Sequence, residues 1–432
     1  MDAHVRAEWE PLTTVAMHRP GMEMFFGLLD PYASLYDRAF PQDDAVIEHE
    51  HLEEILHHEF GITVVQLKAG ITSAARGEPL FRDRLVGEGR RSIRFTGDRE
   101  ESRLASVEFL KNIPAHDPGF FFDLLLMNPE IRLSPGPGER EIDRAITSRQ
   151  PLSNLYFMRD QQIVTGKGIV MGNMAKPQRA REPVLTRMLW DFTGTPVAGA
   201  ISGTGTFEGG DFMPMRDFAL IGTGDRTNRE GVDQFLASRP GIDEIGIVSP
   251  PVHPLMPAGS PDPMVAMHLD TWFNVASSGT AIGSEVLMRN ARVRVLFREG
   301  DRYREDPAAP SLYDYIRGKG FDVIDITTLE QMSYAPNFLC IRENSILAVE
   351  VDRIAKDVLT TLSVKAGMAP DRYGDLFAQA QKDYGMLKAE GQFFPHKKEL
   401  CEHDIDAHPI RLRNLTGGYG AARCLTCPVR RG

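Results

Sequence analysis

Short apolar runs alternate with amphipathic stretches along the chain. Residues 13–19 (TTVAMHR) have the composition of a strand, and apolar residues recur at helical spacing across 47–60. The segment 61–70 (GITVVQLKAG) is rich in β-branched residues, which is typical of a second buried strand. The first part of the chain therefore predicts a strand, a helix and a strand.

From residue 150 onward one arrangement recurs, in which two paired strands are followed by a helix and a further strand. Three instances cover 211–249, 264–326 and 337–364. In the second instance, 264–277 and 284–288 are predicted as strands. A repeated unit of this kind can close radially, which removes sheet edges and leaves a central cleft. The pattern thus predicts an α/β fold built from ββαβ repeats.

Residues 72–149 have a different texture. They are rich in charge and carry helical patterns at 98–113 and 120–131, and a Pro/Gly stretch at 133–141 interrupts them. Strand signals are nearly absent. We therefore predict a helical insertion at 72–149 within a main domain formed by 1–71 and 150–432.

Composition narrows the classes of function. The 432 residues, 42% hydrophobic and 25% charged, suit one large domain with an insertion or two domains. A net charge of −11 argues against a nucleic-acid partner. No apolar stretch reaches the roughly 20 residues that cross a membrane, and the N-terminus lacks the core of a signal peptide. Four cysteines suit a reducing compartment, so a cytoplasmic location is predicted.

Two polar motifs on predicted strands could supply catalytic groups. In MHLD (267–270), His268 and Asp270 are two positions apart, so their side chains share a strand face. In NLYFMRD (154–160), Asn154 and Asp160 are six apart and share a face by the same rule, whereas Arg159 faces away. Taken alone, MHLD is equally well explained as a surface pair, and NLYFMRD is more often a strand end with a turn-forming Asp.

FEGGD (207–211) places two carboxylates on either side of two glycines. Glu208 and Asp211 have opposite strand parity, but the glycines permit a bulge or a close backbone approach that could direct both side chains to one site. Alone, the motif is better explained as a turn between strands.

Cys424 follows a run of glycines and alanines in GGYGAARCLTCP (417–428), where few side chains crowd it. Such a cysteine suits a nucleophile if a histidine and carboxylates converge on it. Cys427 completes a CxxC, but no second Cys/His pair is present for zinc. The histidine-rich helix at 49–58 lacks HExxH, and no GxGxxG or Walker motif occurs. We predict neither a metal nor an organic cofactor.

Together, NLYFMRD, FEGGD, MHLD and the terminal RCLTCP, in this order, resemble the arginine deiminases. That family belongs to the guanidine-modifying superfamily, with amidinotransferases, agmatine deiminase and dimethylarginine hydrolase. The resemblance spans nearly the whole chain and begins at VAMHRPGME (15–23). It implies a five-bladed α/β propeller of pseudo-fivefold ββαβ repeats with a helical insertion. It also implies hydrolysis of L-arginine to L-citrulline and ammonia through a covalent amidino-cysteine intermediate.

The resemblance implies a role for each motif. Cys424 would be the nucleophile and His268 the general acid and base. Asp160 and Asp270 would bind the guanidinium group, and Glu208 would lie beside them in the same cleft.

The remainder of the substrate would have its own binding residues. By resemblance, Asn154 and Arg226 would bind the α-carboxylate end of the substrate. Arg179 would be a second arginine in that role, with Arg181 as a nearby alternative. Asp211 completes the predicted substrate-binding set.

Two positions depart from the family pattern. Tyr419 stands where relatives often have an arginine, five residues before the nucleophile, and YAPNFLCI (334–341) replaces an asparagine-rich motif. These differences leave several alternatives open: an arginine dihydrolase that yields ornithine and ammonia, an amidinotransferase, a non-catalytic arginine-binding relative, and a thiol redox protein. The oligomeric state is also open, with a homo-oligomer among the alternatives.

Overall fold

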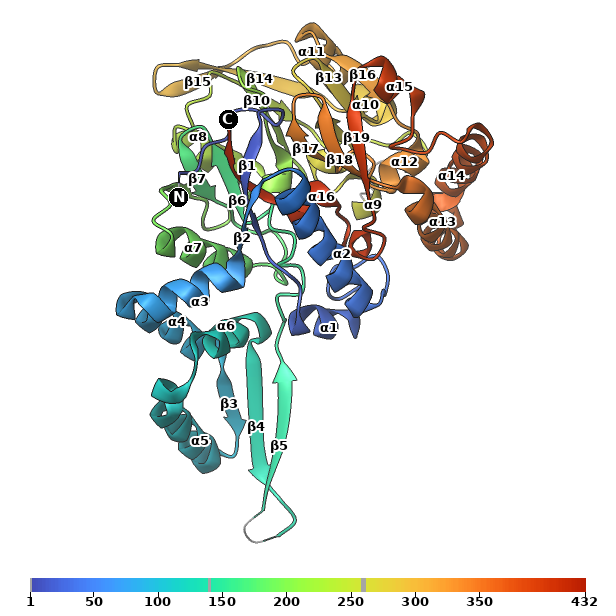
Figure 1. Ribbon diagram of the computed structural model, residues 1–432. Helices are drawn as coiled ribbons and strands as arrows, with labels where there is room; N and C mark the ends of the chain where they lie inside the picture. The colour runs from blue at the N-terminus through green and yellow to red at the C-terminus, as the bar shows by residue number, and fades with distance from the viewer. Residues whose placement is uncertain (1, 139–140, 258–261) are drawn as a thin grey trace.

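The computed structural model describes residues 2–138, 141–257 and 262–432, and repeats one three-stranded unit (Figure 1). In all six sheets of the described chain, a middle strand pairs antiparallel with one neighbour and parallel with the other. One of the six lies within 72–149, and the other five belong to the main body. Helices connect the middle strand to its parallel neighbour, because parallel strands require a crossover connection. The fold is therefore mixed α/β.

Each of the five main-body sheets contains one such set of three strands. They are β2 (Thr63–Gln66), β1 (Leu12–Met17) and β20 (Cys427–Arg431); β6 (Gln162–Thr165), β7 (Gly168–Met171) and β8 (Val197–Ala200); β9 (Phe212–Pro214), β10 (Phe218–Gly222) and β11 (Glu244–Val248), extended by β14 (Val293–Glu299) and β15 (Arg302–Glu305); β12 (Phe273–Val275), β13 (Thr280–Gly283) and β16 (Asp322–Asp325); and β17 (Leu339–Arg342), β18 (Ser345–Val349) and β19 (Asp406–Ile410).

The helices between and around these strands range from single turns to long rods. They are α1 (Met22–Leu28), α2 (Gln42–Glu54), the π-helical turn η1 (Ile55–Glu59), α7 (Glu182–Phe192), η3 (Gly209–Asp211), α8 (Arg229–Ala237), α9 (Pro263–Ala266), η4 (Leu269–Thr271), α10 (Glu285–Asn290), α11 (Leu312–Gly318), α12 (Thr328–Met332), α13 (Val351–Met368), α14 (Pro370–Glu390), α15 (Lys398–Glu402), η5 (Leu415–Gly418) and α16 (Ala422–Leu425). Nowhere in the described ranges is a helix both long and apolar enough to cross a membrane.

The first and third predicted repeats are confirmed. β9 and β10 form a hairpin, α8 follows, and β11 returns parallel to β10. β17, β18 and α13 likewise occupy the predicted positions. The early strand 13–19 and the helix across 47–60 are also confirmed, as β1 and as α2 with η1.

The second predicted repeat is wrong in two places, since 264–277 contains α9 and η4 before β12, and 284–288 lies in α10. Both errors overlook helix caps. The Asp262 side chain accepts a hydrogen bond from the N–H of Met264, and the Ser284 hydroxyl accepts one from Leu287. A side-chain cap of this kind favours a helix in the apolar segment that follows it, although the apolar residues alone suggest a strand.

Two further strand predictions need correction. Residues 154–160 form a series of buried turns that ends before β6, so Asn154 and Asp160 do not share a strand face. Residues 67–70 belong to a helix, because β2 stops at Gln66. The predicted boundary between 71 and 72 therefore falls inside that helix.

The segment 72–149 contains a sheet as well as helices, so the prediction that strands are nearly absent was wrong. Its elements are α3 (Leu67–Gly77), α4 (Pro79–Ser92), β3 (Arg94–Gly97), α5 (Arg99–Asn112), η2 (Ile113–Ala115), α6 (Pro118–Met127), β4 (Pro129–Pro135) and β5 (Ile142–Ser148). The helical pattern read at 120–131 ends at Asn128, which is left-handed (φ 45°) and precedes Pro129. β4 and β5 project away from the remaining sheets (Figure 1).

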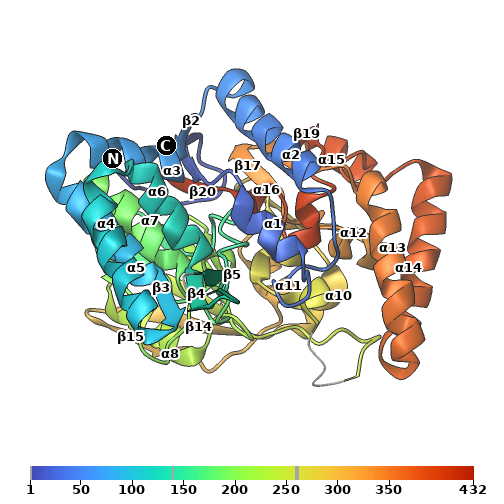
Figure 2. The same ribbon diagram turned by 90° about the horizontal axis from the view of Figure 1, so that it is seen from below.

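The base of this segment packs on the main body through α3, α6 and α7, which lie side by side in Figures 1 and 2. Phe121, Phe122 and Leu189 belong to one buried apolar cluster that joins these helices. By contrast, α5 has no buried residue. The inserted elements thus have a buried base and an exposed outer part.

Candidate active site

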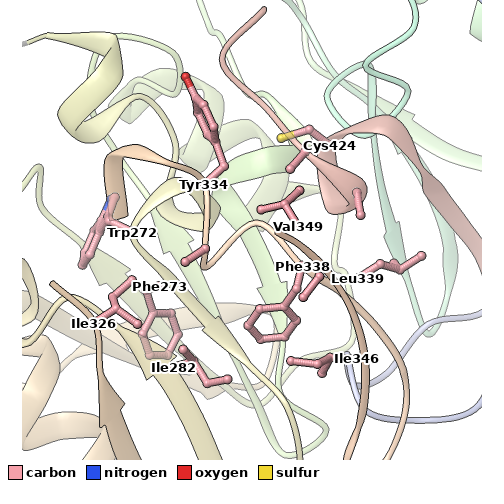
Figure 3. Packing of buried hydrophobic residues seen from close by; sticks show 14 of the residues in the cluster. Trp272, Phe273, Ile282, Ile326, Tyr334, Phe338, Leu339, Ile346, Val349 and Cys424 are labelled. Carbon is pink, nitrogen blue, oxygen red and sulfur yellow. The ribbon is translucent and has the colours of Figure 1, made fainter. Parts of the chain in front are cut away.

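Cys424 lies in the short helix α16, just before β20, and is only 2% exposed. Figure 3 shows it with Tyr334 and Val349 at one end of a buried apolar cluster. Its Sγ lies 3.6 Å from Asp270 Oδ2. Burial, then the negative charges of Asp270 and Asp160, raise the pKa of the thiol well above its usual range. The sulfur is therefore a neutral thiol in this environment.

Glycines allow the backbone to pass closely over these groups. A Cβ on Gly420 would lie 2.8 Å from the Cβ of Cys424. A Cβ on Gly210, in FEGGD, would lie 2.8 Å from the ring of His268. The N–H of Gly210 donates to Asp160 Oδ1 over 3.2 Å. The glycines of FEGGD thus serve a close approach within η3 rather than a turn between strands.

His268 lies immediately before η4 and is fully buried. Its Nε2 is 2.9 Å from Glu208 Oε2, and its Nδ1 is 3.9 Å from Asp160 Oδ1. Burial lowers the pKa of the imidazole, but the charge of Asp160, the hydrogen bond to Glu208 and the charge of Asp211 outweigh burial and raise that pKa to about 9. His268 is therefore an imidazolium at neutral pH.

Glu208 is held as a carboxylate on the other side of this contact. Burial acts to raise its pKa, yet Arg226 and His268 lower that pKa to about 2. Its Oε1 accepts a hydrogen bond from the N–H of Ala175 over 2.9 Å. The charge and orientation of His268 are thereby set by an anion that stays ionised.

The two carboxylates expected to bind a guanidinium each already hold one arginine of the chain. Asp160 Oδ2 lies 2.6 Å from Arg179 Nη1, and Asp270 Oδ2 lies 2.6 Å from Arg423 Nη1. Each keeps its second oxygen less occupied: Asp160 Oδ1 faces the N–H of Gly210, and Asp270 Oδ1 is buried with no hydrogen-bond partner among the described residues. Both aspartates can therefore accept further donors.

Sequence reasoning missed Arg423 and its partner Glu8. Arg423 Nη2 lies 2.7 Å from Glu8 Oε1, and both side chains are buried. Arg159 and Arg431 also lie 3.5 Å from the Glu8 carboxylate. The one available signal was the position of Arg423 directly before the nucleophile candidate.

Asn337, in the altered motif YAPNFLCI, was also missed. Its Oδ1 accepts hydrogen bonds from the N–H groups of Ala421 (2.7 Å) and Cys424 (3.2 Å). Its Nδ2 lies 3.1 Å from Cys424 Sγ and 3.1 Å from the carbonyl oxygen of Asp270. The side-chain amide of Asn337 thus connects the turn that carries Cys424 to the backbone of Asp270.

The predicted substrate-binding residues differ in how many hydrogen bonds and ion pairs they already make within the protein. Asn154 donates to the carbonyl oxygen of Ser34 over 2.7 Å. Arg226 lies 3.5 Å from Glu208 Oε2 and 3.2 Å from the sulfur of Met267. Arg179 is engaged by Glu182 as well as Asp160, so its guanidinium is fully committed.

Asp211 accepts a hydrogen bond from the N–H of Leu269 over 2.9 Å, and burial raises its pKa to about 6. A cavity of about 410 Å³ reaches the site here and is lined by Asp211, His268 and Met267. Cys424 does not line this cavity. In the described chain no hydrogen bond joins Cys424 to His268, and the charge of Asp160 acts on both groups.

Asp160, Glu208 and His268 each offer an atom within 4.8 Å of the others, a geometry that could hold a metal ion. A metal ligand must be a neutral imidazole, whereas the raised pKa of about 9 keeps His268 protonated, which disfavours a metal ion there. The expectation that no metal is needed stays a prediction.

The CxxC does not form a disulfide: Cys424 and Cys427 are both free. Cys427 is buried in β20, and burial raises the pKa of its thiol to about 12. A thiol of that kind is a poor redox partner.

The fold is similar to that of a solved enzyme that acts on arginine. The N-terminal domain of ArgZ, an arginine dihydrolase from cyanobacteria solved with bound product, superimposes with a TM-score of 0.51 at 13% identity over 97% of each chain. At that identity the likeness concerns the fold alone.

The family model for arginine deiminase matches residues 33–431, so the chain belongs to the arginine deiminase family. It is 25% identical to the arginine deiminase of Halobacterium salinarum, over 98% of this chain and 96% of that protein. It is 22% identical to that of Limosilactobacillus reuteri, over 99% and 98%. The resemblance seen in the four motifs is confirmed.

Proposed function

We propose that the protein hydrolyses L-arginine to L-citrulline and ammonia through a covalent amidino-cysteine intermediate. The observation that carries this proposal is one buried group in which acidic side chains face both a thiol and an imidazolium. Asp270 lies 3.6 Å from Cys424 Sγ, and Asp160 lies 3.9 Å from His268. Family membership supports the same reaction.

The group suits a planar cation with several N–H donors. A guanidinium presents paired N–H groups that match carboxylates bidentately. The buried, unpartnered Oδ1 of Asp270 and the lightly occupied Oδ1 of Asp160 supply two such acceptors. Binding of a substrate cation would satisfy an oxygen that is otherwise costly to leave unpaired.

The same cation would activate the nucleophile. In the unliganded site, burial, Asp270 and Asp160 keep Cys424 protonated. A bound guanidinium would offset both anionic charges, and the protonated His268 adds to this effect, so that the pKa of the thiol falls. Substrate binding would thus create the thiolate at the moment it is needed.

The chemistry then proceeds in two halves. The thiolate attacks the central guanidinium carbon to form a C–S bond, and His268 gives its proton to the departing nitrogen, which leaves as ammonia when the C–N bond breaks. Water, deprotonated by the now neutral His268, attacks the amidino-thioether. The C–S bond breaks, citrulline leaves, and the thiolate is restored.

The remaining predicted residues would hold the other end of the substrate. Asn154 and Arg226 would bind the α-carboxylate, and Asp211 would lie against the same ligand. Arg179 is included in the predicted set, but its ion pairs in the unliganded site give it a second task, which is to hold Asp160 in place.

We also propose that the five sheet modules stand radially as blades of a propeller, with 72–149 as an inserted subdomain. The shared strand pattern of the five sheets supports this arrangement. The cytoplasmic location rests on composition and stays a prediction, and the oligomeric state stays open.

Product identification after incubation with arginine tests the proposal. Equal amounts of citrulline and ammonia are expected. Ornithine with two ammonia molecules would instead indicate a dihydrolase, and ornithine without ammonia, in the presence of an acceptor amine, an amidinotransferase. Arginine binding without any product would leave only a non-catalytic relative and would overturn the proposal.

A further inference from the structure

A hollow of about 310 Å³, distinct from the candidate active site, lies where the inserted segment meets α7. Four arginines line it: Arg91 from α4, Arg94 from β3, Arg149 just after β5, and Arg181 just before α7. Glu88 is the one carboxylate among the described lining residues. This concentration of positive charge occurs in a chain with a net charge of −11.

Two of the four arginines, Arg94 and Arg181, have no acidic partner among the described residues, and a third, Arg149, has only a long contact. Arg91 is paired with Glu88, and Arg149 Nε lies 3.7 Å from Glu130, beyond hydrogen-bond range. That Nε is buried and has no hydrogen-bond partner within the described ranges. Arg94 makes no ion pair in the part of the chain that the structure describes.

Arg181 is the most constrained member. Its guanidinium donates only to backbone carbonyl oxygens, those of Leu125 and Gln150. Burial and the charge of Arg149 lower its pKa to about 10. A neutral carbonyl satisfies an N–H group but does not neutralise a cation, so an anion placed between Arg149 and Arg181 would relieve their repulsion.

We propose that this hollow is a binding site for a doubly charged oxyanion, either free phosphate or the phosphoryl group of a small metabolite. Guanidinium groups bind such oxyanions through paired, charge-assisted hydrogen bonds. Arg94, Arg149 and Arg181 supply three positive charges, which a dianion matches better than a single carboxylate. The volume is that of a small-molecule site.

The site lies close to the catalytic group along the chain. Arg181 is two residues after Arg179, which pairs with Asp160, and one residue before Glu182, which pairs with Arg179. An anion on Arg181 would therefore lie beside the turn that holds Arg179, the partner of the predicted substrate-binding residue Asp160. The inference itself concerns binding and does not depend on the proposed reaction.

Calorimetric titration of the full chain with inorganic phosphate, at constant ionic strength set by chloride, tests the site. Arg94→Gln removes an exposed arginine that makes no ion pair in the described chain, and Arg181→Met removes a half-buried one. Arg99→Gln is the matched control, because Arg99 is an exposed arginine on neighbouring α5 that does not line the hollow. Unfolding midpoints without phosphate check that each variant folds.

Wild type and Arg99→Gln are expected to bind phosphate saturably, and Arg94→Gln about tenfold more weakly, as for loss of a charge-assisted hydrogen bond. Titration with a phosphorylated sugar separates free phosphate from a phosphoryl group. Absence of saturable binding of both ligands to wild type would overturn the proposal. So would equal affinity in Arg94→Gln, Arg181→Met and the control.

A second inference rests on an independent observation, the four contacts of the Asn337 amide. Two N–H groups point at one end of this amide, so that end must be the oxygen and the other end the donor. The donor end meets Cys424 Sγ at 3.1 Å and the carbonyl oxygen of Asp270 at 3.1 Å. A donor at sulfur favours the thiolate over the thiol.

We infer that Asn337 is a positioning residue that directs the Cys424 sulfur and stabilises its anionic form. The kinetic consequence rests on the proposed function, whereas the thiol chemistry does not. The test is therefore the pH dependence of Cys424 alkylation by iodoacetamide in a Cys401→Ser background, since Cys401 is the exposed cysteine.

Asn337→Asp keeps an oxygen for the two N–H groups but replaces the donor at sulfur with a carboxylate oxygen. The lost donor and the added negative charge are together expected to raise the thiol pKa by at least about one unit. Asn274→Ser is the control, because Asn274 supports the same loop through Pro336 and Phe338 without touching the sulfur. An alkylation profile in Asn337→Asp that matches the control would refute the inference, even if arginine were hydrolysed normally.

Discussion

Glu8 and Arg423 form an ion pair of 2.7 Å with 1% and 0% of their side chains exposed, whereas Arg76 and Asp117 form one of 2.8 Å with 55% and 57% exposed. The first pair lies under the candidate active site, and the second lies on the inserted segment. Their geometry is similar, but their surroundings are opposite.

Surroundings decide what such a pair does. Near water, attraction is screened and side-chain entropy offsets most of it, so exposed pairs contribute little. In the interior, each charge depends on its partner, because a lone buried charge is costly. The buried network therefore fixes the positions and protonation states of the reacting groups, while the exposed pairs of the insertion mainly keep it solvated.

The largest expected effect comes from the nucleophile. Replacing the buried Cys424 with alanine should reduce citrulline formation by more than about 10³-fold, because no other described thiol lies among the carboxylates. Replacing the exposed Cys401 with serine should leave turnover unchanged. Citrulline formation measures both variants. A similar loss of turnover in Cys424→Ala and Cys401→Ser would contradict the expected difference between the buried and the exposed cysteine.

The next largest effect is on stability. Glu8→Gln leaves Arg423, Arg159 and Arg431 without their shared carboxylate and should cost about 3–5 kcal/mol of unfolding free energy. Because the pKa of Glu8 is lowered to about 2, the carboxylate stabilises the fold above pH 4.5 and loses that contribution as pH falls through 2. Denaturant unfolding of wild type and Glu8→Gln should therefore give unfolding free energies whose difference becomes smaller as the pH falls toward 2. A constant difference from pH 7 to pH 2 would contradict this.

The third effect is a shift in pH dependence. With the pKa of His268 raised to about 9, the imidazolium is present at neutral pH and is lost as pH rises through about 9. kcat/KM should fall over the same pH range. The contribution of the raised pKa to the unfolding free energy is fully present below pH 6.5 and should be lost over that range as well. Glu208→Gln should move the falling limb of kcat/KM to lower pH, toward the usual histidine value. If the falling limb of kcat/KM stayed at the same pH in Glu208→Gln, Glu208 would not be what raises the pKa of His268.

The smallest effect is expected on the insertion. Lys111 and Glu108 on α5 are 3.5 Å apart with side chains 67% and 64% exposed. Lys111→Gln should change the unfolding free energy by at most about 0.5 kcal/mol and leave turnover unaltered. A loss near that of Glu8→Gln would show that exposure does not separate the two regions.

Local patterns were enough for much of the fold. β1, α2, α8 and α13 follow from periodicity that each segment carries by itself. The segment 154–160 could not be predicted in this way, because its apolar residues are buried in turns. β4 and β5 were missed because their mostly exposed positions lack the apolar alternation of a half-buried strand.

Some residues of the candidate site could likewise be predicted from local patterns, and others could not. Cys424, His268 and Glu208 stand in motifs that mark them as chemically active. Asn337 has no such mark, because its partners are 84 and 87 residues away.

By itself, the sequence determined the inventory of reactive groups, the order of their motifs and most of the helices, since these depend on residue type and spacing within short windows. Only the tertiary structure decided which charges meet: Glu8 and Arg423 are 415 positions apart and still share a hydrogen bond. The physical reason is that pKa and ion pairing depend on burial and on neighbours in space, and both are set when distant segments pack together.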